Sequence, residues 1–214
     1  MSVQLIDGAI DSVVSNSSKQ KLEIDLDSPE QWQDSDPVAI CCHPHPLHGG
    51  SMQNKVVHIL AKTFLALNAQ VVRFNFRGVG QSSGEFAQGI GERDDLLAVV
   101  DWVKQQWPQA PIWLAGFSFG AFVAAACHEK IKPQRLILVA PPVDMYPEIK
   151  AIQIQTDDWL LIQGGQDEIV ESNAVLEWAK QQSHPAKQVF LEDTGHFFHG
   201  QLNTVRDRIL EVWE

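Results

Sequence analysis

Three side chains have the types and the order along the chain that are needed to activate a serine hydroxyl. Ser118 stands at the centre of a G-x-S-x-G motif at residues 116–120, and Asp167 and His196 follow it. A serine hydroxyl is a weak nucleophile until a base accepts its proton and an acid orients that base. We therefore expect Ser118 to be the nucleophile, His196 the base and Asp167 the acid.

Two other residues could fill the roles of base and acid. His199 lies three residues after His196, where we expect the closing helix to begin, and Asp144 follows the predicted strand before the one that leads to Asp167. The order Ser, Asp, His favours Asp167 and His196. If Asp167 faces His196, its neighbour Glu168 should point away.

An acyl-transfer site also needs N–H groups that bind the oxyanion. The N–H of Phe119 is one candidate because it opens the helix after Ser118, where backbone donors are unpaired. A second should come from the loop at residues 43–50, in which Pro44 and Pro46 have no N–H. That leaves His45 and Leu47, and we favour His45 because it lies two residues past the preceding strand.

Two of the loops contain residues that could belong to a metal site or a cofactor site. His43, His45 and His48 could hold a zinc ion, but the prolines between them fix their directions, and no H-E-x-x-H or paired-cysteine pattern accompanies them. The G-x-G at residues 78–80 lacks the rest of a dinucleotide or phosphate motif. We expect neither a metal nor a cofactor.

Alternating strands and helices must position these residues. Strands are predicted at residues 3–6, 22–26, 37–42, 70–76, 112–115, 135–140, 158–164 and 187–191, and helices at 51–67, 92–107, after 121, at 172–182 and at 202–213. The first two strands should form an antiparallel edge pair. The remainder predicts an α/β fold with a mostly parallel sheet, helices on both faces, and the candidate loops together at the carboxyl ends of the strands.

Helix-end residues give further predictions. We expect Ser172 to cap its helix, and Glu92, Asp94 and Asp95 to complement the dipole in the first turn of theirs.

The composition predicts one globular domain over residues 1–214, with 44% apolar residues. With 27 acidic against 16 basic residues the net charge is -11, which disfavours nucleic-acid and membrane partners. No stretch has the form of a signal peptide or a membrane span. Cys41, Cys42 and Cys127 show no disulfide spacing, so we expect buried thiols and a cytoplasmic location.

Longer blocks of sequence resemble the α/β-hydrolase superfamily, and within it a group of small bacterial serine hydrolases without a lid. The matching blocks are residues 43–44, 49–52, 54–57, 72–77, 114–120 and 196–199, whereas residues 45–48 depart from the pattern. The resemblance implies a three-layer α/β-hydrolase fold, a serine esterase triad of Ser118, Asp167 and His196, and no defined substrate.

The sequence itself agrees with the absence of a cap domain, because residues 141–157 are too few to form one. We expect an open site with Met145, Tyr146, Phe197 and Phe198 as its walls. The predicted activity is hydrolysis of small carboxylic esters or thioesters through an acyl-enzyme. Acyl transfer or amide cleavage on the same triad, and a non-catalytic binding protein that kept the fold, are the alternatives.

Overall fold

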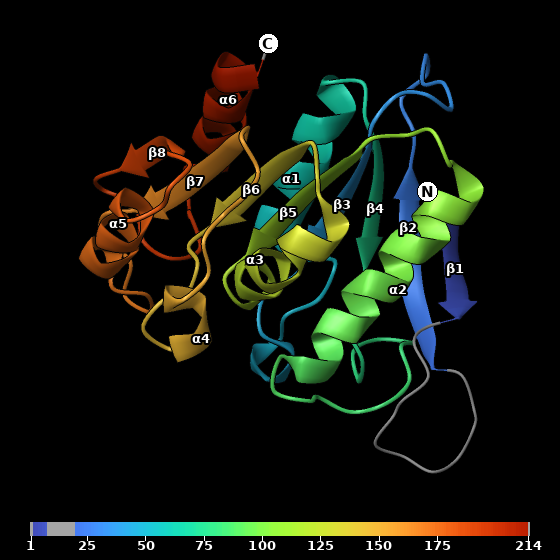
Figure 1. The fold of residues 1–214 in the computed structure, drawn as a ribbon, viewed down its shortest axis with the longest axis horizontal. Coiled ribbons are helices and arrows are strands. Elements are labelled where there is room, and N and C mark those ends of the chain that lie inside the picture. The colour runs from blue at the N-terminus through green and yellow to red at the C-terminus, as the bar shows by residue number, and fades with distance from the viewer. Residues whose placement is uncertain (1, 8–19, 214) are drawn as a thin grey trace.

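One eight-stranded sheet organises the chain in the computed structural model, which describes residues 2–7 and 20–213 (Figure 1). The strands are β1 (Ser2–Asp7), β2 (Lys21–Asp27), β3 (Val38–Cys42), β4 (Gln70–Phe74), β5 (Ile112–Phe117), β6 (Arg135–Val139), β7 (Trp159–Gly164) and β8 (Lys187–Leu191). Their order across the sheet is β1-β2-β4-β3-β5-β6-β7-β8. Residue 1, residues 8–19 and residue 214, which the sequence assigns to the same domain, lie outside the described ranges.

The sheet is parallel except at one edge. β2 runs antiparallel to both β1 and β4, and every other pair of neighbours is parallel. The predicted antiparallel edge pair and the mostly parallel sheet are therefore confirmed. The carboxyl ends of the parallel strands β3, β5, β7 and β8 all lie at the same end of the sheet. The loops that carry the candidate residues therefore gather at this end.

Helices cover both faces of the sheet. They are α1 (Lys55–Ala66), α2 (Ile90–Gln106), α3 (Phe119–Ile131), α4 (Pro147–Lys150), α5 (Ser172–Lys180) and α6 (Leu202–Trp213), and a 3-10 turn, η1, spans Pro46–His48. Residues of α1 and α6 share one apolar core with the sheet, while those of α2, α3 and α5 share the other. This is the predicted three-layer arrangement.

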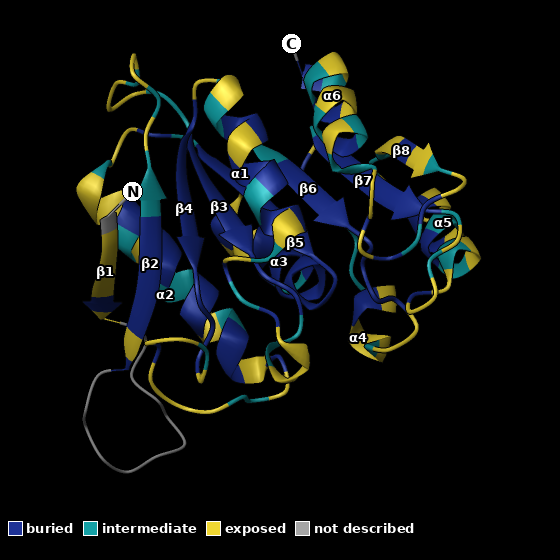
Figure 2. Cartoon of the chain, turned by 180° about the vertical axis from the view of Figure 1, so that it is seen from behind, coloured by how far each residue is buried: buried dark blue, intermediate teal, exposed yellow. Residues whose placement is uncertain are grey.

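The central strands are buried on both sides, as Figure 2 shows by their colour. Every residue of β3, β5 and β7 is buried, which explains why these segments are continuous apolar runs rather than alternating ones. Cys41 packs into the core under α1 and Cys42 into the core under α3. Both are free thiols, as is Cys127, and burial raises the pKa of Cys41 and of Cys127 to about 12.

Among the residues that the structure describes, no cap domain covers the loops at the carboxyl ends of the strands. The segment between β6 and β7 contains only the four-residue helix α4. Among the helices of the described ranges, none is both long enough and apolar enough to cross a bilayer.

The start of α1 and the cap of α5 differ from the sequence prediction. α1 begins at Lys55 because Asn54 caps it, its Oδ1 accepting from the N–H of Val56 at 2.9 Å. Ser172 is not a cap, since the carboxylate of Glu171 accepts from the first N–H groups of α5. A carboxylate one residue earlier satisfies the same orphan donors.

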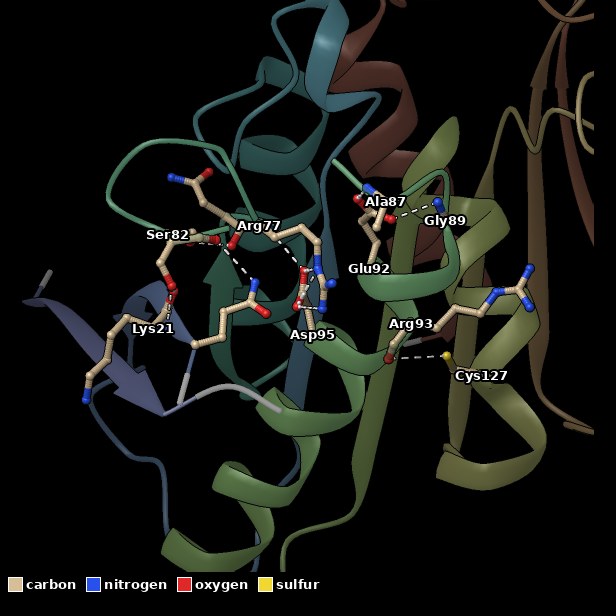
Figure 3. Close-up of polar contacts among 12 residues, drawn as sticks. Lys21, Arg77, Ser82, Ala87, Gly89, Glu92, Arg93, Asp95 and Cys127 are labelled. Carbon is tan, nitrogen blue, oxygen red and sulfur yellow. Dashed lines mark hydrogen bonds and ion pairs between the residues drawn. The ribbon is translucent and has the colours of Figure 1, made fainter. Parts of the chain in front are cut away.

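The start of α2 is built around two buried carboxylates (Figure 3). Glu92 accepts from the N–H groups of Gly89 and Ala87 at 2.7 and 2.8 Å, so it acts at the helix start as expected. The expectation that Asp94 and Asp95 complement the dipole in the first turn is wrong, because α2 begins at Ile90 and, of the three acids, only Glu92 lies in that turn. Asp95 lies beyond it and forms a buried ion pair with Arg77 at 2.7 Å. Burial raises the pKa of Asp95, and the guanidinium opposes that rise.

Candidate active site

The turn between β5 and α3 holds Ser118 in an unusual backbone conformation. Its φ is +53° and its ψ is −118°, a region that non-glycine residues rarely adopt. A Cβ at Gly116 would lie 2.2 Å from the carbonyl oxygen of Gly120, and one at Gly120 would lie 2.3 Å from that of Cys42. The two glycines therefore allow the close approach of strand and helix that the motif predicts.

Asp167 and His196 meet Ser118 in a continuous chain of hydrogen bonds. His196 Nδ1 lies 2.8 Å from Asp167 Oδ2, and His196 Nε2 lies 3.1 Å from Ser118 Oγ. The side chain of His196 is 3% exposed and that of Asp167 is fully buried. Because a carboxylate only accepts, Nδ1 donates to Asp167, and Nε2 is left with a lone pair towards the serine hydroxyl.

Backbone and side-chain donors hold the Asp167 carboxylate in place. Its Oδ1 accepts from the N–H groups of Ile169 and Val170 at 2.9 and 2.8 Å, and its Oδ2 accepts from Gln163 Nε2 at 3.1 Å. Burial by itself would raise the pKa of Asp167, but the hydrogen bonds from His196 and the two N–H groups outweigh it and lower that pKa. The acid is therefore kept ionised beside the imidazole.

Glu168 contradicts the expectation that it points away. Its carboxylate accepts from the backbone N–H of His196 at 3.0 Å, so it holds the loop that presents the imidazole. Neither Glu168 nor Gln163 was singled out from the sequence for these contacts, since no spacing rule links them to His196. The alternative acid Asp144 pairs with Lys150 at 2.8 Å instead.

In the loop after β3, one of the two candidate backbone donors is already used. The N–H of Leu47 donates to His45 Nδ1 at 3.2 Å, so it is used within the loop. The N–H groups of His45 and Phe119 have no acceptor among the residues that the structure describes. Both residues line the hollow in front of Ser118, where their N–H groups remain available to a ligand.

His43 fixes the direction of that loop. It is fully buried, its Nε2 accepts from the N–H of Phe76 at 3.0 Å, and its Nδ1 donates to the carbonyl of Pro44 at 2.6 Å. The Pro44 carbonyl and the His45 N–H belong to one planar peptide unit and point in opposite directions. His43 therefore sets where the His45 N–H points.

Both nitrogens of His43 are used in these bonds, so it could not also ligate a metal. In the described ranges, no group of three or more histidine, cysteine and acidic residues is arranged to hold a metal ion. Burial lowers the pKa of His43 to about 4, which keeps the ring neutral.

A cavity of about 120 Å³ lies in front of Ser118 and opens to solvent. Met145, Tyr146 and Phe197 line it, as predicted, together with Ile169. The prediction for Phe198 is wrong. Its side chain is fully buried in the core under α1 and α6, because this neighbour of Phe197 turns to the opposite side of the loop.

Phe86 supports the same wall from the loop before α2. Its ring lies 4.8 Å from that of His45 and 5.7 Å from that of Phe119. Arg77 belongs to the same loop as Phe86, and its ion pair with Asp95 ties this loop to α2. The loop thus packs, through Phe86, against the residues of both candidate oxyanion donors.

Comparisons with known proteins extend these observations. The profile of the family described as serine aminopeptidase, S33, matches residues 45–159. The structure is similar to an α/β serine hydrolase homologue from Coxiella burnetii, with a TM-score of 0.89, 41% identity and coverage of 100% of this chain and 97% of that one. An α/β serine hydrolase without lid from Xanthomonas campestris gives a TM-score of 0.89 at 40% identity, covering 99% and 92%.

The proteins that are similar in sequence differ in how much of their length this chain matches. An uncharacterized protein of Rickettsia prowazekii is 35% identical over 172 residues, which cover 76% of this chain and 72% of that protein. The lysophosphatidylserine lipase of Danio rerio is 29% identical over 57% of this chain, and the match spans only 32% of the lipase.

Proposed function

Because this chain belongs to the serine aminopeptidase S33 family of α/β serine hydrolases, we propose that it hydrolyses small carboxylic esters or thioesters. One observation carries the proposal. The hydrogen bonds between Asp167 and His196 and between His196 and Ser118 form the geometry that activates a serine nucleophile. Under this proposal Ser118 is the nucleophile, His196 the base and Asp167 the acid that orients it.

The reaction runs in two halves. Ser118 Oγ attacks the carbonyl carbon while His196 Nε2 takes its proton, and the oxyanion accepts from the N–H groups of Phe119 and His45. When the tetrahedral intermediate collapses, the bond to the alcohol breaks and His196 returns the proton to the leaving oxygen. Water then attacks the acyl-enzyme through the same base, releasing the acid and restoring Ser118.

The cavity supports small acyl groups. Its 120 Å³ corresponds to roughly four water molecules, and no cap domain adds further walls. We expect the highest kcat/KM for acyl chains of roughly two to four carbons.

Labelling of the serine tests the proposal most directly. A fluorophosphonate probe should form one adduct, on Ser118, and Ser118→Ala should abolish both the adduct and the hydrolysis of p-nitrophenyl acetate. His196→Ala should do the same, whereas the matched control His199→Ala, which removes the alternative base, should keep wild-type turnover. A folded wild type without an adduct would favour the non-catalytic binding protein instead.

The same assays separate the related chemistries. Faster release from a p-nitroanilide than from the matching ester would favour amide cleavage, and products carrying an added acceptor alcohol would favour acyl transfer. We further propose a small-molecule partner rather than nucleic acid, from the net charge of -11, and a cytoplasmic location, from the three free thiols.

A further inference from the structure

A second hollow, of about 510 Å³, lies beside the candidate active site between α1 and the start of α6. Residues of these two helices share one core, and Figure 1 shows both helices on the same face of the sheet. We call this hollow the α1–α6 groove. It is lined by Gln53, Lys55, His58, Ile59, Lys62, Gly200, Leu202 and Asn203.

The charge of the α1–α6 groove is opposite to that of the whole chain. The sequence has 27 acidic and 16 basic residues, yet the lining includes two lysines and a histidine and no acid. A hollow of similar size beside α2 is lined instead by Asp7, Asp94 and Asp101. The positive lining is therefore a local feature and does not follow from the composition.

The three basic side chains come from one face of one helix. Lys55, His58 and Lys62 stand at positions i, i+3 and i+7 of α1, a spacing that aligns them along the groove. Within the described part of the chain, neither Lys55 nor Lys62 lies within ion-pair distance of a carboxylate. Their charges are therefore available to a bound anion.

The carboxylates nearest to this face are already engaged. Asp25 and Asp27 pair with the buried guanidinium of Arg73 at 2.7 and 3.0 Å. Burial lowers the pKa of His58, the positive charges of Arg73 and Lys62 lower it further, and the two aspartates only partly offset them. With one guanidinium against two carboxylates, this group carries one net negative charge, which is smaller than the two positive charges of Lys55 and Lys62.

Two segments of the chain, residues 53–55 and 197–200, contribute to the walls of both the α1–α6 groove and the catalytic cavity. Asn54 lines the cavity, whereas its neighbours Gln53 and Lys55 line the groove, and Phe197 lines the cavity three residues before Gly200 lines the groove. Since successive Cα atoms are about 3.8 Å apart, the residues that line the cavity and those that line the groove are immediate neighbours at positions 53–55. One small molecule could occupy both.

The proposed mechanism decides which part of that molecule would reach the groove. The leaving alcohol receives its proton from His196 Nε2, so it departs on the side of the His196 loop. That loop runs on through Gly200 into the wall of the groove. The acyl part then occupies the apolar cavity beside Met145 and Tyr146.

We propose that the α1–α6 groove binds an anionic group, a phosphate or a carboxylate, on the alcohol part of the ester substrate. This inference rests on the proposed function and narrows its substrate class to anionic esters. Lys55 and Lys62 would bind the anion by charge, with hydrogen bonds from Gln53 and Asn203.

Esters that differ only in charge test this. The probes are 4-acetoxybenzoate, its neutral methyl ester, and 4-acetoxyphenyl phosphate, assayed with the wild type and with the double variant Lys55→Gln/Lys62→Gln. We expect the double variant to raise KM for both anionic esters roughly five- to ten-fold, because two exposed charge contacts are lost, with kcat unchanged. KM for the methyl ester should not move. A comparison of the KM values of the phosphate probe and the carboxylate probe shows which of the two anionic groups the groove binds better.

Controls separate this effect from net charge. Lys104→Gln/Lys130→Gln, on α2 and α3, removes the same charge outside the groove and should leave every KM at the wild-type value. The wild-type preference for anionic esters should also fall between about 20 and about 200 mM NaCl. Equal KM values in the wild type and the groove variant, or an equal shift in the control variant, would overturn the inference.

Failure of the proposed function can be told apart from failure of the groove inference, because no ester, charged or neutral, would then be hydrolysed. In that case calorimetry with 4-hydroxyphenyl phosphate decides the groove separately. Binding to Ser118→Ala that is lost on adding the two groove substitutions would support the anion site, and no binding would refute it.

Discussion

Replacing His43 by asparagine or by glutamine separates the two bonds that hold the loop of the proposed oxyanion donor, His45. His43 Nδ1 donates to the Pro44 carbonyl at 2.6 Å, and Nε2 accepts from the N–H of Phe76 at 3.0 Å. The amide nitrogen of asparagine lies near the position of Nδ1, while the amide oxygen of glutamine reaches near that of Nε2. His43→Asn should therefore keep the bond to Pro44, and His43→Gln should keep the bond from Phe76.

The two variants should lose similar stability but different amounts of activity. Each leaves one buried backbone group unpaired, which costs about 1–3 kcal/mol of unfolding free energy. Only His43→Gln releases the peptide unit that carries the His45 N–H. Complete loss of one oxyanion donor lowers kcat about 10²–10³-fold, so a loosened donor should lower it by roughly ten- to a hundred-fold, with KM unchanged.

Titration of His43 adds a dependence on pH. Burial lowers its pKa from 6.5 to about 4, so the folded protein resists protonation. The stability that this contributes is fully present above pH 6.5 and is lost as the pH falls towards 4. The unfolding free energy should fall by roughly 3 kcal/mol in total, of which about 2 kcal/mol should be lost by pH 5.

Urea unfolding at pH 8 and pH 5, together with kcat and KM for p-nitrophenyl acetate at pH 8, measures all of these effects. Both variants should lose less stability than the wild type between the two pH values, since they lack the titrating ring. Equal losses of kcat in His43→Asn and His43→Gln, or a wild-type kcat in His43→Gln, would refute the link between His43 and the oxyanion donor.

Further substitutions test the framework of the site. Gly120→Ala places a Cβ 2.3 Å from a carbonyl oxygen of β3, so thermal unfolding should show a loss of about 3 kcal/mol or more, and an unchanged Tm would contradict the packing argument. Arg77→Met should cost about 3–5 kcal/mol in urea by leaving the buried charge of Asp95 without its cation. Adding Asp95→Leu should restore only part of this loss, because the backbone N–H at position 77, which donates to Asp95 Oδ2 at 3.0 Å, then has no acceptor; no recovery at all would count against the ion pair. Phe198→Ala should cost about 3–5 kcal/mol because the ring is fully buried. Phe197→Ala should change KM for p-nitrophenyl esters with little change in stability, and the reverse pattern would mean that the wall is misassigned.

Local patterns allowed much of the architecture to be predicted. Continuous apolar runs predict strands buried on both faces, helical spacing predicts α1 and α6, and the G-x-S-x-G motif predicts the turn at Ser118. These features depend on backbone geometry and on nearest neighbours along the chain, which the sequence specifies directly. The absence of a cap follows for the same reason, since it is a matter of segment length.

Contacts between distant segments were decided only by the tertiary structure. Ser118 and His196 are 78 positions apart, and the order of residues could suggest their bond but not its length of 3.1 Å. No local pattern predicts that Glu168 holds the backbone of His196, or that Asp95 is buried against Arg77. A carboxylate can cap a helix, pair with a distant cation or bind a backbone N–H, and which of these it does depends on the groups that folding brings within about 3 Å. The α1–α6 groove has the same origin, because its two walls come from residues 53–62 and 200–203, which are far apart in the sequence and meet only when the sheet is covered.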